Sequence, residues 1–100
     1  LENSFNTPNP VLDQTTFVLK HNRPRELLEA KIYIFAIDGK RIWHTSQNVF
    51  SNGYLIDSLS WNATTYSGQP ANKGTYLYTI ELISALSGSS DTISGKLIIN

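Results

Sequence analysis

Cysteine and methionine are both absent from this chain of 100 residues, and its charges cancel. Without cysteine the chain can form no disulfide, no thiolate nucleophile and no cysteine-ligated zinc site. Eight Lys and Arg residues balance eight Asp and Glu residues, so no net field attracts nucleic acid or an anionic membrane. A chain of this length buries roughly 60–68% of its unfolded surface, enough for one core without metal or disulfide cross-links. We therefore expect a single domain.

Charged side chains are also scarce, at 16% of the sequence against about 25% in an average protein. Ser, Thr and Asn together number 29, a polar composition common in extracellular β-domains. Long apolar stretches are missing too, because the longest run covers only residues 32–37 and a membrane-spanning helix needs roughly 20 residues. No signal peptide is recognisable. We expect an excised or mature piece of a longer protein.

Short alternating runs of apolar and polar residues between turn signals are the main pattern that is present. Their spacing is typical of an antiparallel β-sandwich of six or seven strands. Residues 1–10 are rich in Pro and Asn and predict an extended linker segment, so we assign residues 11–100 to the sandwich. Strands are predicted over residues 15–21, 28–37, 40–45, 54–59, 74–82 and 92–100.

The strand over residues 28–37 is apolar on one face throughout and on both faces near its end. This pattern predicts a central strand that is covered on both sides there. A helix starting at Pro24 is the alternative, because residues 25–30, Arg-Glu-Leu-Leu-Glu-Ala, are good helix formers, but the β-rich run that follows favours a turn there. Asp38-Gly39, directly after the strand, predicts a hairpin.

Residue patterns that carry catalysis are missing. His21 and His44 stand alone on predicted strands, and no metal-ligand spacing, phosphate-binding glycine loop or nucleophile elbow occurs. The basic residues form no common face, which argues against a nucleic-acid partner. We therefore expect no catalytic, metal-binding or cofactor-binding residue and no cofactor in these 100 residues.

Aromatic side chains leave a carbohydrate-binding module as an alternative. Trp61, Tyr76 and Tyr78 lie in phase with apolar strand faces and are better explained as core residues. Trp43 and Tyr66 are the rings that remain for stacking on a sugar.

The last predicted strand can serve a partner instead, because a strand at a sheet edge offers backbone groups for strand addition. The candidate docking element is the chain end, which comprises Lys96, Leu97, Ile98, Ile99 and Asn100. Completing the sheet of its own domain is the alternative role.

Several motifs occur in an order that resembles a known family. The sequences Pro-Asn-Pro-Val at 8–11, Ile-Tyr-Ile-Phe-Ala-Ile-Asp-Gly-Lys at 32–40 and Gly-Lys-Leu-Ile-Ile at 95–99 resemble the Ig-like C-terminal domains of type IX secretion proteins. Thr-Thr-Phe at 15–17 with His-Asn-Arg-Pro at 21–24 is most similar to the domain of PorU-type surface sortases.

A further region resembles the pattern Trp-Asp-Gly…Gly-Val-Tyr-x-Tyr, which FlgD-type Ig-like domains share. The residues matched to the structural motif are Asp38, Gly39, Trp61, Gly74, Tyr76 and Tyr78. Two departures stand out. The loop at 62–67 lacks the family's acidic residues, which argues against cation binding there, and Thr75 replaces Val.

The resemblance implies a non-catalytic Ig-like β-sandwich that acts as a secretion signal and a surface-docking domain. Its implied partners are a PorV-type outer-membrane β-barrel shuttle and the type IX translocon, without membrane insertion of its own. The implied location is the extracellular face of the outer membrane, with any Cys-peptidase domain outside this chain. The final strand and its carboxylate end would make the contact.

Two alternatives remain open. The domain could be the cleavable C-terminal domain of a secreted cargo protein, or it could be a carbohydrate-binding or scaffold module. A FlgD-type role in hook assembly suits the motifs at 8–10 and 95–97 less well.

Overall fold

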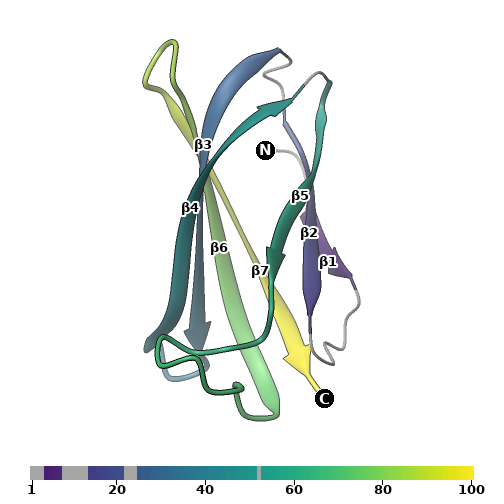
Figure 1. Cartoon of the computed structure of the whole chain (residues 1–100), viewed down its shortest axis with the longest axis vertical. Helices are drawn as coiled ribbons and strands as arrows, with labels where there is room; N and C mark the ends of the chain where they lie inside the picture. Colours follow the sequence, from purple (N-terminus) through teal and green to yellow (C-terminus); the bar gives the residue numbers. More distant parts are fainter. Residues whose placement is uncertain (1–3, 8–13, 22–24, 52) are drawn as a thin grey trace.

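The structure is a computed structural model that describes residues 4–7, 14–21, 25–51 and 53–100. Its strands lie in two layers that face each other (Figure 1). Within the described residues no helix is long and apolar enough to cross a membrane. The strands are β1 (Ser4–Thr7), β2 (Thr15–Lys20), β3 (Glu26–Ala36), β4 (Arg41–Ser51), β5 (Leu55–Trp61), β6 (Gly74–Ser84) and β7 (Ser90–Ile99).

The two sheets have the orders β1-β2-β5 and β4-β3-β6-β7, and their strand pairs are antiparallel. The chain crosses between the layers from β2 to β3, from β4 to β5 and from β5 to β6, whereas the other consecutive strands pair within one sheet. This arrangement confirms the predicted all-β, Ig-like antiparallel sandwich of about seven strands.

The start of the sandwich differs from the prediction. Residues 1–10 were assigned to a linker outside the domain, yet Ser4–Thr7 forms β1 and pairs with β2, from Ser4 opposite Leu19 to Thr7 opposite Thr16. A four-residue strand next to two prolines has too little alternation to be recognised locally, and it becomes a strand through its pairing with β2. Residues 8–11, which carry the first family motif, lie outside the described residues.

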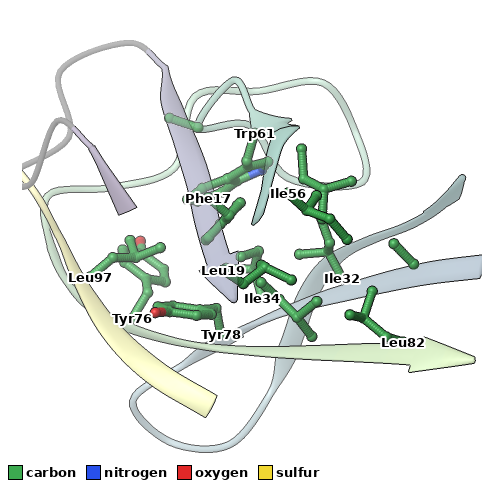
Figure 2. Packing of buried hydrophobic residues seen from close by; sticks show 14 of the residues in the cluster. Phe17, Leu19, Ile32, Ile34, Ile56, Trp61, Tyr76, Tyr78, Leu82 and Leu97 are labelled. Atoms are coloured by element: carbon green, nitrogen blue, oxygen red, sulfur yellow. The ribbon is translucent and has the colours of Figure 1, made fainter. Parts of the chain in front are cut away.

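The predicted apolar faces form the core between the sheets. On β3 the side chains of Leu28, Ala30, Ile32 and Ile34 are fully buried, and the matching face of β6 is equally closed. Successive side chains of a strand point to opposite faces, so β3 and β6 bury every second residue along most of their length. Figure 2 shows part of this core, with Ile32 and Ile34 of β3 and Tyr78 of β6 among the labelled side chains. The core predicted from alternation is confirmed.

A bulge explains an irregular burial pattern on β5. Phe17 pairs with Leu59 and Leu19 pairs with Ile56, so β5 contains one residue more than β2 over this interval. The extra residue lets Ile56 and Leu59 both point inward although they are three positions apart. Trp61 returns to the normal alternation and is 1% exposed, as expected from its position after Leu59.

The Asp38-Gly39 hairpin forms between β3 and β4 as predicted. Gly39 N–H donates to the carbonyl of Ala36 at 2.9 Å, and Ala36 N–H donates to the carbonyl of Lys40 at 2.8 Å. Gly39 has a φ of 91°, the left-handed region that glycine adopts readily. Asp38 accepts a hydrogen bond from Lys40 N–H at 3.0 Å, which supports the turn.

Contacts between β2 and β6 mark the centre of the sandwich. The rings of Phe17 and Tyr78 lie 5.0 Å apart, centroid to centroid, where antibody-type Ig domains place a disulfide between the sheets. Two residues before Tyr78, the Tyr76 hydroxyl donates to the backbone carbonyl of Asn72 at 2.7 Å. A tyrosine near the start of this strand that bonds back to the preceding loop is a hallmark of the Ig fold, the tyrosine corner.

One predicted feature of β3 is wrong. The outer face of its second half was expected to be covered, but among the described residues no element lies over it. Tyr33 and Phe35 are half-buried there, and Ile37, just after the strand, is 68% exposed. The apolar character of this face therefore belongs to a surface and not to a second core.

Candidate docking surface

The predicted docking element lies on β7, an edge strand of the four-stranded sheet. β7 pairs with β6 on one side, with Leu97 opposite Tyr76 and Ile98 opposite Thr75. Its end approaches β1 of the other sheet, as Figure 1 shows for the yellow strand. This edge position agrees with the predicted role in strand addition, and the docking itself stays a prediction.

Only part of the predicted element faces outward. Leu97 and Ile99 are 0% and 5% exposed and belong to the core, while Lys96, Ile98 and Asn100 are exposed. The strand alternation divides the five residues in this way. Leu97 and Ile99 therefore stabilise the sandwich, and a partner can contact the side chains of the other three.

Gly95 directly precedes this segment and has a steric role. A Cβ built on Gly95 would lie 2.5 Å from Cζ and from Oη of Tyr78, its partner across the strand pair. The Tyr78 ring, 3% exposed, therefore occupies the space above Gly95. An aromatic ring lying across a glycine of the neighbouring strand stabilises an edge strand.

The outer face beside β7 is slightly hollowed. A shallow depression of about 320 Å³ lies over β3, β6 and β7 and is lined in part by Phe35, Leu77 and Lys96. These three side chains come from one row of the sheet, because Phe35 pairs with Leu77 and Leu77 pairs with Lys96. The depression combines apolar walls with one ammonium group at the edge of the sheet.

The other residues of the structural motif support the fold. The Trp61 indole N–H donates to the backbone carbonyl of Thr64 at 2.9 Å, and its ring meets that of Tyr76 at 6.3 Å. Gly74 opens β6 with a φ of 145°. Ala63 has a φ of 59° where the family pattern has Gly, so the backbone keeps the left-handed conformation that glycine favours. The observed contacts of these motif residues are therefore contacts that pack and shape the fold.

The two rings considered for carbohydrate stacking lie in different surroundings. Trp43 is half-buried against the core, and its ring lies 6.0 Å from Trp61. Tyr66 is 54% exposed, but its hydroxyl lies 2.6 Å from Nδ1 of His44. His44 is therefore engaged by a loop residue, whereas the sequence left it isolated.

The outer face carries a row of aromatic side chains that the sequence did not predict. Tyr33 lies 6.4 Å from Phe35 and 6.1 Å from His44, centroid to centroid, and the guanidinium of Arg41 lies 5.6 Å from the centre of the Tyr33 ring. The apolar second face of residues 33–37 is the sequence pattern that corresponds to this row. Strand pairing adds His44 and Arg41, which only the register of β4 brings beside Tyr33.

Among the residues that the structure describes, no group of three or more His, Asp or Glu side chains lies close enough to hold a metal ion. The loop at 62–67 and the residues that follow it are joined by backbone hydrogen bonds. Thr65 N–H donates to the carbonyl of Gln69, and Ala71 N–H donates to the carbonyl of Ala63.

Comparison with solved structures relates the chain to part of a larger protein. No family model matches the chain, and no curated protein matches it. The crystal structure of dimeric latent PorU from Porphyromonas gingivalis matches with a TM-score of 0.78 and 26% sequence identity. The match covers 96% of this chain and 9% of that chain, so this chain spans a small part of PorU. Over nearly its whole length, the chain is similar in fold and in sequence to a domain-sized part of PorU.

Proposed function

We propose that this chain is a non-catalytic domain of a PorU-like type IX secretion protein and that it acts as a secretion signal and a surface-docking domain. In this proposal an outer-membrane β-barrel of the PorV type recognises it at the extracellular face of the outer membrane. The domain passes the type IX translocon beforehand and does not insert into the membrane itself. The similarity to PorU over 96% of the chain carries the proposal.

The contact surface in this proposal is the exposed side of β7. Lys96, Ile98 and Asn100 face outward, and the depression beside Lys96 adds the apolar side chains of Phe35 and Leu77. The zero net charge suits this kind of surface, because apolar and backbone contacts would supply more of the affinity than long-range attraction. Leu97 and Ile99 hold the strand in place from the core side.

The test uses surface substitutions in the full-length parent protein, because deleting residues 96–100 would also remove two core side chains. Ile98→Glu introduces a charge at a side chain that is 45% exposed. Leu27→Glu is the matched control, since Leu27 is 48% exposed and lies on β3, outside the proposed surface. We expect Ile98→Glu to reduce secretion and capture of the purified barrel at least about tenfold, while Leu27→Glu leaves both unchanged.

Two results would contradict the proposal. Normal secretion and barrel capture by the folded Ile98→Glu, Lys96→Glu double variant would exclude β7 as the docking surface. The mass of the mature surface protein addresses the cargo alternative, because loss of this domain from the mature protein identifies it as cleavable.

A further inference from the structure

The outer face of β3 and β4 gathers positive charge that the balanced composition conceals. Lys31 and Arg41 line a depression of about 260 Å³, to which Tyr33 also contributes. Arg41 and Lys40 line a second depression of about 290 Å³, whose other wall is the loop at Tyr66, beside the start of β4 (Figure 1). The two depressions share Arg41. The sequence predicted no common basic face, because strand register and the loop bring these side chains together.

Arg41 is the cation that the fold leaves most available to a ligand. Glu81 lies opposite Lys31 across β3 and β6 and offsets part of its charge. Asp38 lies beside Lys40 in the hairpin and accepts a hydrogen bond from its backbone N–H at 3.0 Å. Arg41 is exposed and lies opposite an aromatic side chain of β3. Among the described residues none of the three cations forms an ion pair.

A row of ring contacts holds the Arg41 guanidinium in place. The guanidinium lies 5.6 Å from the centre of the Tyr33 ring, a cation–π contact. The Tyr33 ring lies 6.1 Å from that of His44, whose Nδ1 is 2.6 Å from the Tyr66 hydroxyl. A side chain that is already ordered loses less conformational entropy when it binds. Its planar fork can take one carboxylate through two parallel N–H···O bonds.

The shape and chemistry of these depressions favour an acidic peptide over other anionic ligands. The Tyr33 ring carries the guanidinium, which leaves less aromatic surface for stacking on a sugar. A nucleic acid needs a continuous basic stripe, and the carboxylate of Glu29 interrupts this lining. Hollows suit a chain segment that protrudes into them better than the flat surface of a bilayer. Clusters of basic side chains recognise acidic peptide motifs in several kinds of domain.

We propose that this surface binds an acidic, extended segment of a partner protein. One carboxylate of the segment lies on the Arg41 guanidinium and a second lies on the Lys40 ammonium group. The segment passes from the depression at Tyr66 to the depression beside Lys31, since the two hollows share Arg41. The surface does not include β7, so this proposal and the proposed docking of β7 stand or fall separately.

The test is a titration of the isotope-labelled chain with a short peptide of alternating glutamate and serine, acetylated and amidated at its ends and followed by NMR. We expect chemical-shift changes at Lys40, Arg41 and Tyr66, including the Arg41 side-chain Nε–H, and weaker binding at higher salt. The same peptide with glutamine in place of glutamate should bind at least about tenfold more weakly. This comparison uses the unmodified chain and is independent of how any variant folds.

Variants of the chain locate the site and separate binding from positioning. Arg41→Gln should weaken binding of the glutamate peptide at least about tenfold. Lys20→Gln is the matched control, because Lys20 is an exposed cation on the other sheet, and it should bind like the unmodified chain. Tyr33→Leu keeps the cation but removes the ring beneath it. It should shift the Arg41 Nε–H resonance of the free chain and weaken binding less than Arg41→Gln does.

Several results would overturn the proposal. They are an absence of shifts at millimolar peptide, equal binding of the glutamate and glutamine peptides, unchanged binding by folded Arg41→Gln, and shifts that map to another face. Tighter binding of trigalacturonate, or of phosphatidylglycerol vesicles, than of the glutamate peptide would overturn the assignment to a peptide ligand.

Discussion

Replacing Gly95 by alanine tests whether the Tyr78 ring needs the space above the β7 backbone. The added Cβ would lie 2.5 Å from Cζ and Oη and 2.7 Å from Cε2 of that ring, whereas unstrained carbon contacts are about 3.5–4.0 Å. The ring must therefore shift by about 1 Å. It cannot shift freely, because Tyr78 is 3% exposed and the Phe17 ring lies 5.0 Å from it.

The expected change in the free energy of unfolding is the difference between two opposing effects of Gly95→Ala. Overpacking of a closed core costs about 1–3 kcal/mol. Alanine in place of glycine lowers the conformational entropy of the unfolded chain, which stabilises the folded state by about 0.4–1 kcal/mol. This gain applies here because Gly95 is not among the glycines with positive φ, so alanine can adopt its backbone conformation. We expect a net loss of about 1–2 kcal/mol. For a domain of this size that corresponds to a fall in Tm of roughly 5–15 °C.

Thermal unfolding followed by far-UV circular dichroism, with urea unfolding as a second method, measures this loss. Ser94→Ala, one position away on the same strand and exposed, is the control and should stay close to the unmodified chain. In a Tyr78→Leu background the cost of Gly95→Ala should shrink, because the clashing ring is gone. The reasoning is refuted if Gly95→Ala is as stable as the unmodified chain or if its cost is unchanged in that background.

Two further stability predictions concern Tyr76 and the alternation of β7. Tyr76→Phe removes the 2.7 Å hydrogen bond to the Asn72 carbonyl and should lower the free energy of unfolding by about 1–2 kcal/mol in urea titrations; a value within error of zero would contradict a tyrosine corner. Leu97→Ala should cost about 2–5 kcal/mol because Leu97 is fully buried, whereas Ile98→Ala, at an exposed neighbouring position, should cost well under half as much in the same assay. Equal losses at both positions would contradict the inward and outward division of β7.

Local sequence patterns were sufficient to predict much of this fold. Alternation on residues 54–61 and 74–82 identified Trp61, Tyr76 and Tyr78 as core residues, since a strand packed on one face must bury every second side chain. Asp38-Gly39 predicted the hairpin, because few residues other than glycine adopt the left-handed backbone of Gly39 without strain.

Features that depend on distant residues could not be predicted. β1 is too short to show a clear alternation of polar and apolar residues, and it is a strand because it pairs with β2. The bulge that turns both Ile56 and Leu59 inward depends on the register with β2. The candidate docking element was predicted as five equivalent residues, and only the pairing of β7 with β6 separates the buried Leu97 and Ile99 from the exposed remainder.

By itself, the sequence determined that this chain is an all-β sandwich with an aromatic core and no cysteine chemistry, because composition and local periodicity are properties of neighbouring residues. The tertiary structure alone decided which strands lie at the sheet edges. It also decided that Tyr33, His44 and Arg41 form one surface. Edges and shared faces arise from strand order and register, which join residues far apart in the chain.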